Sequence, residues 1–320
     1  MSKSTLAKRI EALSQMERGS PGYQEAQEEF LRVYYAARER SAGSLLGRLT
    51  LRQRKCLHPL MLAVIKLKNR LDGITVEVLH DRRTVAEGPV IFAVTHVGKS
   101  DVEAVSEAIG SHYTLLSGDF ERMHGTVNET FLKVNGVIYV CEHDKADRRS
   151  AVTRMTDALK QGSNLMYYPE GAWNLSDHLP VLPCYWGIVK VAQAGNATVI
   201  PVAAEQYGKH FVVNIGSAMS MAPYGENLSA AICDLRDAMA ALKWEIWESQ
   251  PSERRAALHG NEWKAFTDAR LKEWPLTLDS IQEAILKPKG ITHRADAFRH
   301  LAVIRPSAAS AFLFNKRLRG

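Results

Sequence analysis

Cysteine is scarce in this 320-residue chain, and the four that occur are far apart. Cys56, Cys141, Cys184 and Cys233 form no C-x-x-C pair and no metal-ligand spacing. This usage excludes a disulfide-stapled scaffold and a cysteine-based zinc module. We therefore expect reduced thiols, as in a cytosolic protein, and no bound metal.

Long hydrophobic runs are also missing. The longest apolar stretch, Cys56 to Leu67, is interrupted by His58, Pro59 and Lys66, and no stretch approaches the roughly 20 residues that span a bilayer. The segment from Met1 to Ser20 alternates charged and apolar residues, without the apolar core of a signal peptide. We therefore expect a cytoplasmic protein without a transmembrane helix.

Charge of one sign dominates only locally. Lysine and arginine number 41 against 35 acidic residues, a formal net charge of +6. This excess suits an anionic partner, although it also serves solubility alone. No basic block contains interleaved aromatics, so we do not expect nucleic-acid binding.

The basic excess concentrates between Leu46 and Arg70, where seven lysines and arginines bracket the apolar run and no acidic residue intervenes. Such a segment predicts a helix that lies on an anionic membrane, at the inner face of the cell membrane. A helix packed on the domain with a solvated basic rim is the alternative.

Strand-like and helix-like periodicities alternate through the middle of the chain, which indicates an α/β fold: a central, mostly parallel or mixed sheet with helices on both faces. We expect N-terminal helices over 1–72, this α/β domain over 73–225 and a helical region over 226–320. Residues 142–149 predict a charged loop, and Pro201 predicts the end or edge of a strand. The predicted strands are 75–79, 90–94, 113–117, 137–141, 165–168, 198–202 and 210–215, and the predicted central helices are 101–109, 126–134, 151–159 and 187–194.

The flanking helices carry packing faces. Two helices are predicted between Ser4 and Arg40, broken at Gly19–Gly22. Apolar residues recur at helical spacing in the second of them and again beyond Gly225. These stripes are Phe30, Val33, Tyr34 and Ala37, and Ile232, Leu235, Met239, Leu242 and Ile246.

A strand-turn-helix unit carries the first candidate chemistry. The apolar run Val90–Val94 leads into His96, and Asp101 opens the following helix. A histidine and an aspartate so placed can meet as a base and the group that orients it. Gly98-Lys99-Ser100 also suggests a phosphate loop, but the first glycine of that motif is replaced by Ala93.

Other polar residues follow strands, where sites of α/β folds lie. His96, Glu142, Glu170 and Ala203 each come after a predicted strand. We expect the loops that carry the first three to face one cleft.

Four blocks occur together in a fixed order. The His-x-x-x-x-Asp block is followed by a glycine with an apolar strand, a Pro-Glu-Gly turn, and an Ile-Pro-Val strand. In chain order they are Thr95–Asp101, Gly136–Val140, Tyr168–Gly171, and Leu182-Pro183 with Gly187 and Val199–Val202.

With these blocks, residues from about Val90 to Val202 resemble the glycerolipid acyltransferase family, which includes the lysophosphatidic acid and glycerol-3-phosphate acyltransferases. The resemblance implies transfer of a fatty acyl group from a thioester, on coenzyme A or acyl carrier protein, to a hydroxyl of a lipid precursor. It implies His96 as the general base and Asp101 as its orienting partner, with no cofactor and no acyl-enzyme. Glu170 and Gly171 would serve structure and acceptor binding. Because a carboxylate after a buried strand is costly if left unpaired, we expect Glu170 to bond to backbone N–H groups or to the acceptor hydroxyls.

The chain departs from the family where basic residues usually contact the acceptor phosphate. Glu142, Ala172-Trp173 and the segment Cys184–Trp186 stand at those positions. Either other cations substitute, or the acceptor is flatter or less charged, such as a sugar ring, a lipid or an amine-bearing headgroup. The substitute cations are Lys99, Lys145, Arg148 and Arg149, and the aromatic candidates are Trp173, Tyr185 and Trp186.

The same departures leave a second reading open. A non-catalytic peripheral membrane or carrier-binding protein could keep the fold and lose the acceptor site. The presence of His96 and Asp101 favours the enzyme.

Overall fold

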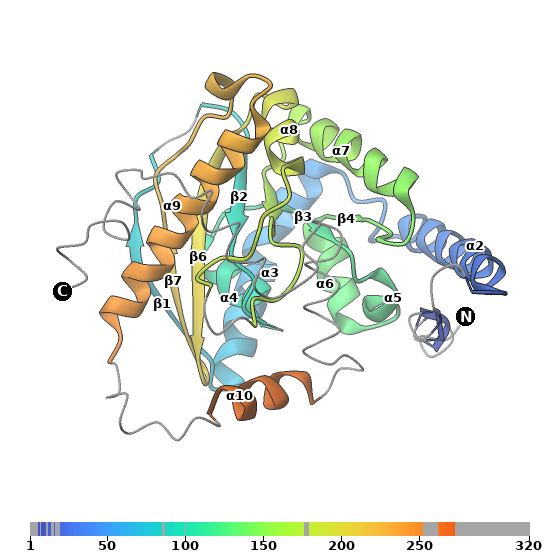
Figure 1. Ribbon diagram of the computed structural model, residues 1–320, viewed down its shortest axis with the longest axis horizontal. Helices are drawn as coiled ribbons and strands as arrows, with labels where there is room; N and C mark the ends of the chain where they lie inside the picture. The colour runs from blue at the N-terminus through green and yellow to red at the C-terminus, as the bar shows by residue number, and fades with distance from the viewer. Residues whose placement is uncertain are drawn as a thin grey trace. The chain divides into compact units, whose positions relative to one another are not determined.

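The fold was examined in a computed structural model. It describes residues 6, 8–10, 12–13, 16, 20–84, 87–98, 100–175, 179–251 and 262–272 (Figure 1). The chain divides into two compact units: the first contains Met1–Ile65 and Ser111–Met166, and the second contains Lys66–Gly110 and Tyr167–Gly320. Each unit combines strands with helices, which confirms the predicted α/β class. The predicted three-part division by sequence position stays a prediction.

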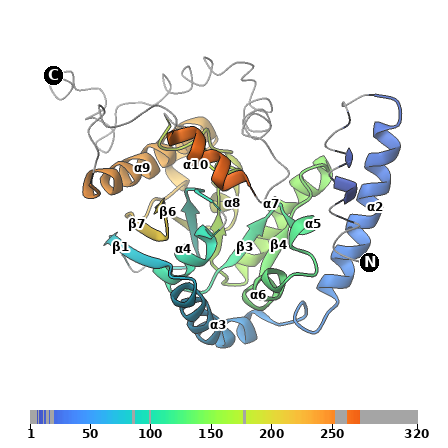
Figure 2. The ribbon, with the colours of Figure 1, turned by 90° about the horizontal axis from the view of Figure 1, so that it is seen from below.

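In the first unit, β3 is the middle strand and pairs in parallel with β4 and β5. Helices α6 and α7 pack on these strands (Figure 2). The predicted face of Phe30, Val33, Tyr34 and Ala37 is buried, together with Phe120, in one hydrophobic cluster. The unit contains α2 (Tyr23–Ala42), most of α3 (Leu51–Leu71), β3 (Thr114–Ser117), α5 (Phe120–Met123), α6 (Val127–Asn135), β4 (Val137–Tyr139), α7 (Lys145–Lys160) and nearly all of β5 (Leu165–Tyr167).

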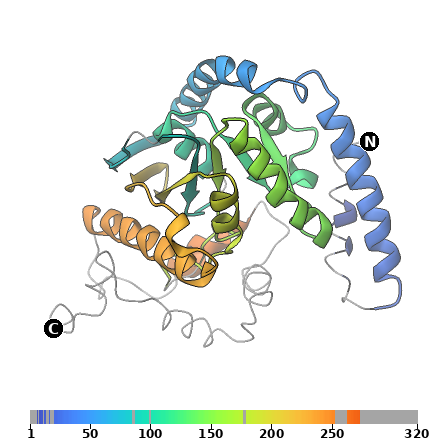
Figure 3. The ribbon, with the colours of Figure 1, turned by 90° about the horizontal axis from the view of Figure 1, so that it is seen from above.

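In the second unit, four strands pair in the order β1-β7-β6-β2, and only the β6–β7 pair is antiparallel. Helix α9 packs along β6 and β7 (Figure 3). The predicted apolar stripe of α9 is buried there, except that Ala231 takes the place of Ile232. The unit contains β1 (Thr75–Asp81), β2 (Val90–Val94), α4 (Asp101–Ile109), α8 (Gly187–Ala194), β6 (Thr198–Tyr207), β7 (His210–Ile215), η1 (Ala222–Tyr224), α9 (Leu228–Ser249) and α10 (Glu262–Leu271).

The prediction that Pro201 ends its strand or lies at an edge is wrong, because β6 continues to Tyr207 between two neighbours. Residues 198–202 pair with β2, and residues 202–207 pair with β7. The backbone nitrogen of Pro201 points away from β2, and the pairing with β7 begins only at Val202. The N–H group that proline lacks would therefore have made no hydrogen bond between strands. Its carbonyl still accepts a hydrogen bond from Gly216 N at 2.9 Å. Ala203 therefore lies inside the strand and does not follow it.

The predicted charged loop over 142–149 is also wrong in its second half, because α7 begins at Lys145. The side chain of Asp144 accepts a hydrogen bond from Ala146 N and caps the helix. Ser, Thr, Asp and Asn stabilise this position because they satisfy free N–H groups of the first turn. Lys145, Arg148 and Arg149 are therefore exposed on this helix, whereas Asp147 is buried.

Helix α3 forms as the basic segment predicts, and it continues through Pro59. One side of it is solvent-exposed and carries large apolar side chains among basic ones. Within the described residues, no helix has the length and apolar character needed to cross a membrane. The exposed apolar residues are Leu60, Val64, Leu67 and Leu71.

Candidate active site

His96 and Asp101 meet across the turn between β2 and α4, as the sequence predicts. His96 Nδ1 lies 2.7 Å from Asp101 Oδ2. Asp101 is fully buried, and the His96 side chain keeps 20% of its surface accessible. A carboxylate on Nδ1 orients the ring and stabilises its protonated form, which leaves Nε2 as the nitrogen that can act as a base.

The turn is held in shape by the same carboxylate. Asp101 Oδ2 also accepts hydrogen bonds from Val97 N at 2.8 Å and Gly98 N at 3.1 Å. The backbone N–H groups that a phosphate loop would offer to a nucleotide are therefore turned onto Asp101. Nothing in this geometry favours the nucleotide-binding alternative.

Glu170 ties the Pro-Glu-Gly turn to the histidine loop. Its side chain is fully buried. Oε1 accepts from His96 N at 2.9 Å, and Oε2 accepts from Leu182 N at 2.7 Å. Burial raises the pKa of the Glu170 carboxyl, and these two N–H donors together with Lys243 and His96 oppose that rise. The expected bonding to backbone N–H groups is found, while a contact of Glu170 with substrate stays a prediction.

Gly171 is required by both conformation and space. Its φ of +71° lies in the left-handed region, and a Cβ there would stand 2.6 Å from Tyr185 Cε2. Tyr185 N in turn donates to Pro169 O at 2.8 Å. The predicted residues Gly171 and Tyr185 therefore form one close contact, which a larger residue at 171 would force apart.

Aromatic rings surround His96. The ring of Tyr168 lies 4.3 Å from the imidazole, centroid to centroid, and the ring of Trp173 meets it edge-on at 6.1 Å. Trp173 also packs against the apolar cluster that contains Leu175 and Leu271. Trp173 was predicted from its position after Pro-Glu-Gly. The role of Tyr168 was missed, although the residue opens that block.

Three hydrogen bonds of Asn174, one from its backbone and two from its side chain, were not predicted from the sequence. Asn174 N donates to His96 O at 2.7 Å, and the Asn174 side chain donates to the carbonyls of Leu179 and Pro180. This loop and the Glu170 turn thus hold the backbone of His96 from two directions. A hydrogen bond between backbone groups of distant loops leaves no trace in residue type.

The other predicted site residues are not joined to this cluster by the contacts described. Arg148 and Arg149 are exposed on α7 in the first unit, where Arg148 donates to Glu142 O. Lys99 lies outside the described residues. The loops of His96 and Glu170 are joined by the hydrogen bond from His96 N, and the expectation that they and Glu142 face one cleft stays a prediction.

Comparison with known proteins supports the predicted resemblance. Residues 74–205 match the family described as Acyltransferase. Among solved structures, the 1-acyl-sn-glycerophosphate (LPA) acyltransferase PlsC from Thermotoga maritima resembles the chain with a TM-score of 0.51 at 14% identity. That similarity covers 71% of this chain and 95% of PlsC. No curated protein matches the chain.

The alternating strands and the His96–Asp101 pair thus lie within the segment that is similar to the Acyltransferase family. The match over residues 74–205 confirms the resemblance inferred from the four sequence blocks. The structural similarity to PlsC extends the shared fold beyond that segment.

Proposed function

We propose that the protein is an O-acyltransferase that moves a fatty acyl group from an acyl thioester to a hydroxyl of a lipid precursor. The observation that carries this proposal is the 2.7 Å contact between His96 Nδ1 and the buried Asp101 carboxylate, inside the segment that matches the family. A hydroxyl is a poor nucleophile near neutral pH, so the reaction needs a positioned base.

In the proposed reaction, His96 Nε2 removes the proton of the acceptor hydroxyl as its oxygen attacks the thioester carbon. Asp101 stabilises the imidazolium that forms. The tetrahedral intermediate collapses with cleavage of the carbon–sulfur bond, and the imidazolium returns its proton to the leaving thiolate. The products are an ester and a free thiol, so neither a metal nor an acyl-enzyme is required.

The acceptor is proposed to contact an aromatic surface. Tyr168 and Trp173 adjoin His96, and Tyr185 covers Gly171. An aromatic ring cannot make the forked hydrogen bonds by which arginine binds a phosphate. A lysophosphatidate, the acceptor in the name of PlsC, would then need cationic residues from another part of the protein to bind its phosphate. An acceptor with a sugar ring or a less charged headgroup would not need them.

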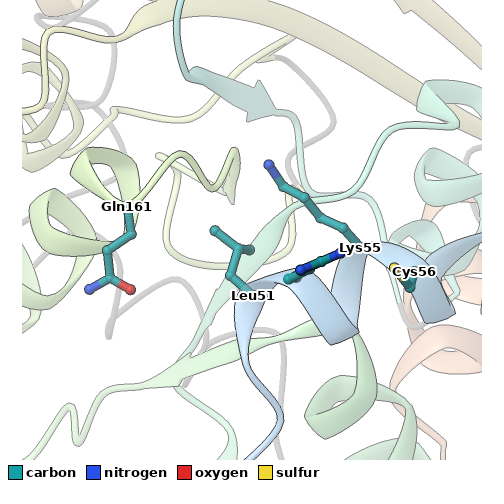
Figure 4. A pocket seen from close by; sticks show the side chains of 5 residues that line it. Leu51, Lys55, Cys56 and Gln161 are labelled. Atoms are coloured by element: carbon teal, nitrogen blue, oxygen red, sulfur yellow. The ribbon is translucent and has the colours of Figure 1, made fainter.

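We further propose that the protein contacts an anionic membrane through α3. Leu60, Val64, Leu67 and Leu71 follow helical spacing and are 40–77% exposed. Exposed Lys66 and Arg70 lie among them. At the start of the helix, Leu51, Arg52, Lys55, Cys56 and Gln161 line an open hollow of about 460 Å³ (Figure 4). A basic helix with one apolar side lies in the plane of a lipid surface, where both features contribute to binding.

Thiol release from long-chain acyl-coenzyme A and from acyl carrier protein tests the chemistry. Wild type and His96→Ala are compared with glycerol phosphate, lysophosphatidate or a lipid extract as acceptor. We expect release that falls at least about 100-fold in the variant, the lower end of what a general base contributes. Release in the presence of only one acceptor class identifies the acceptor, and release that is independent of His96 contradicts the mechanism.

Vesicle binding tests the membrane contact separately. Lys66→Gln/Arg70→Gln should weaken binding to anionic vesicles by roughly 1 kcal/mol per charge. Arg40→Gln/Lys160→Gln removes the same charge from exposed positions on α2 and α7 and serves as the control. Equal loss in both double variants would mean that net charge, and not α3, governs binding.

A further inference from the structure

Lys243 is a buried cation that no motif of the sequence indicates. It lies on α9, outside the family-matched segment 74–205, and only 2% of its surface is exposed. A lysine is rarely buried to this extent, because an unpaired ammonium is costly to remove from water. The groups that Lys243 contacts therefore show how the cost of burying its charge is offset.

The ammonium contacts the strand beside the catalytic loop. Lys243 Nζ donates to Ala204 O at 2.5 Å and pairs with Glu205 Oε2 at 3.1 Å. Trp247 Nε1 donates to the same Glu205 oxygen at 2.8 Å. Lys243 thus binds one carbonyl and one carboxylate of β6, and both bonds anchor α9 to that strand.

The carbonyl that Lys243 binds also belongs to the support of His96. Thr95 Oγ1 donates to Ala204 O at 3.3 Å and accepts from Ala204 N at 2.9 Å. Thr95 is fully buried and directly precedes His96. A continuous chain of hydrogen bonds therefore runs from the Lys243 ammonium through Ala204 to the residue that begins the catalytic turn.

The charge of Lys243 also acts on Glu170, where it lowers the pKa of the carboxyl against the larger effect of burial. Both carboxylate oxygens of Glu170 accept backbone N–H bonds, and the described residues include no ion-pair partner for it. Lys243 and His96 are the cationic groups whose charge acts on this carboxylate, and Glu205 is the carboxylate that competes for Lys243. An ionised carboxylate needs such compensation when it is fully buried.

We propose that Lys243 is a positioning residue of the acyltransferase site: by holding the Ala204 carbonyl that Thr95 also binds, its ammonium fixes the strand end from which His96 extends, and its charge acts on the buried Glu170. This inference rests on the proposed function. An ionised Glu170 can accept from His96 N and Leu182 N at once, and a protonated carboxyl is a poorer acceptor for both. Loss of Lys243 should therefore loosen the His96 backbone first at the acid end of the working pH range.

The activity test compares pH profiles of kcat/KM for acyl transfer. In Lys243→Met the acid limb should move up by about one pH unit, because a nearby opposite charge is lost. Lys243→Arg keeps the charge and should retain the parental limb. Glu205→Gln removes the competing carboxylate and should move the limb down. An unshifted limb in both Lys243→Met and Glu205→Gln overturns the proposal.

Arg82→Met is the matched control. Arg82 pairs with Glu245 of the same helix at 2.8 Å, and both side chains are partly exposed. This variant breaks an ion pair of α9 without removing the charge that acts on Glu170. An acid limb shifted as far as that of Lys243→Met would assign the effect to the packing of α9 and would overturn the proposal.

A second test does not depend on activity. The melting temperature of Lys243→Met should fall further below that of the parent at pH 7.5 than at pH 5, because buried carboxylates lose their cation only where they are ionised. Adding Glu170→Gln to Lys243→Met should reduce this pH-dependent difference in melting temperature, and an unchanged difference overturns the proposed interaction between Lys243 and Glu170.

If the wild type transfers no acyl group, the proposed function fails, while this comparison of single and double variants still decides whether Lys243 and Glu170 interact. Should Lys243→Met not fold, the Glu205→Gln profile decides the proposal, because an unmoved limb contradicts it.

Discussion

Two buried carboxylates, one in each compact unit, are held in different ways. Asp147 of the first unit receives Arg38 Nη1 at 2.8 Å, Arg154 Nη2 at 2.9 Å and Cys141 N at 2.7 Å. Among the described residues, those that donate directly to Glu170 of the second unit are the backbone N–H groups of His96 and Leu182. The two arginines therefore neutralise the negative charge of Asp147. Glu170 has no such direct partner among the described residues, and we propose that Lys243 compensates its charge.

Their acidities differ accordingly. Burial raises the pKa of both carboxyls. At Asp147 the hydrogen bond and charge of Arg38, the Cys141 N–H and the charge of Arg154 together outweigh burial and lower the pKa below its ordinary value. The pKa of Glu170 stays raised. Asp147, which serves stability, is thus paired with arginines and has a lowered pKa. Glu170, which adjoins the proposed base, has a raised pKa, and perturbed pKa values of this kind are typical of functional sites.

The histidines of the two units repeat the contrast. His96 faces the carboxylate of Asp101, which favours the imidazolium. His112 Nε2 lies 2.7 Å from the neutral carbonyl of Asn135. Burial, together with the charges of His58, Lys55 and Arg54, outweighs the hydrogen bond to Asn135 O and lowers the pKa of His112 to about 4. His96 is therefore placed to accept a proton, and His112 is placed to remain neutral.

The largest expected effect concerns the proposed catalytic pair His96 and Asp101 in the second unit. Asp101→Asn keeps an oxygen for the N–H groups of Val97 and Gly98 but presents no charge to His96. We expect kcat for thiol release to fall about 10²–10⁴-fold, because the ring loses its orientation and its stabilised protonated form. The melting temperature should change little. A kcat close to that of the wild type would remove Asp101 from the mechanism.

The pH dependence of stability tests the structural histidine. An unfolded chain protonates His112 below a pKa of about 6.5, whereas the folded protein resists protonation until about pH 4. Stability should therefore be lost as the pH falls through this window, by up to about 3 kcal/mol. Urea unfolding between pH 7 and pH 4.5 measures it. His112→Gln should flatten the curve, and His210→Gln, at a partly exposed position, should not.

Removing the carboxylate of Asp147 tests whether its pairing with arginines stabilises the first unit. Asp147→Ala leaves Arg38 and Arg154 without their partner, and we expect a loss of about 2–3 kcal/mol in unfolding free energy, less than for a fully buried pair because both arginines are partly exposed. Asp268→Ala breaks the exposed pair with Lys264 and should cost under about 1 kcal/mol. Equal losses would mean that burial does not distinguish these pairs.

The smallest effect concerns the turn that carries Glu170. Gly171→Ala places a Cβ against Tyr185 and imposes a positive φ on alanine. We expect a loss of about 1–2 kcal/mol in unfolding free energy. Gly208→Ala has a similar φ with no atom within 4 Å, so it isolates the conformational part. Adding Tyr185→Ala to Gly171→Ala should recover only the steric part, and complete recovery would show that the conformational part is absent.

Much of the fold was predictable from local pattern. The bounds of α4 and α8 agree with the apolar spacing, and the buried run Val90–Val94 is the strand β2. Two local expectations failed, one on the pairing of a strand and one on the start of a helix. Pro201 is tolerated because its missing N–H faces no partner, and Asp144 starts a helix that the charge run conceals.

The sequence by itself determined the class of the domain and the pair His96 and Asp101, because five residues across a strand-turn-helix unit constrain both side chains to one place. It also indicated that Glu170 would seek backbone donors, since a buried carboxylate must be satisfied. Only the tertiary structure decided which donors these are, His96 N and Leu182 N. It alone brought Tyr168 against the imidazole and Lys243 against the carbonyl of Ala204 in β6. Such contacts depend on how strands and helices pack across long sequence separations, and residue spacing carries no record of that packing.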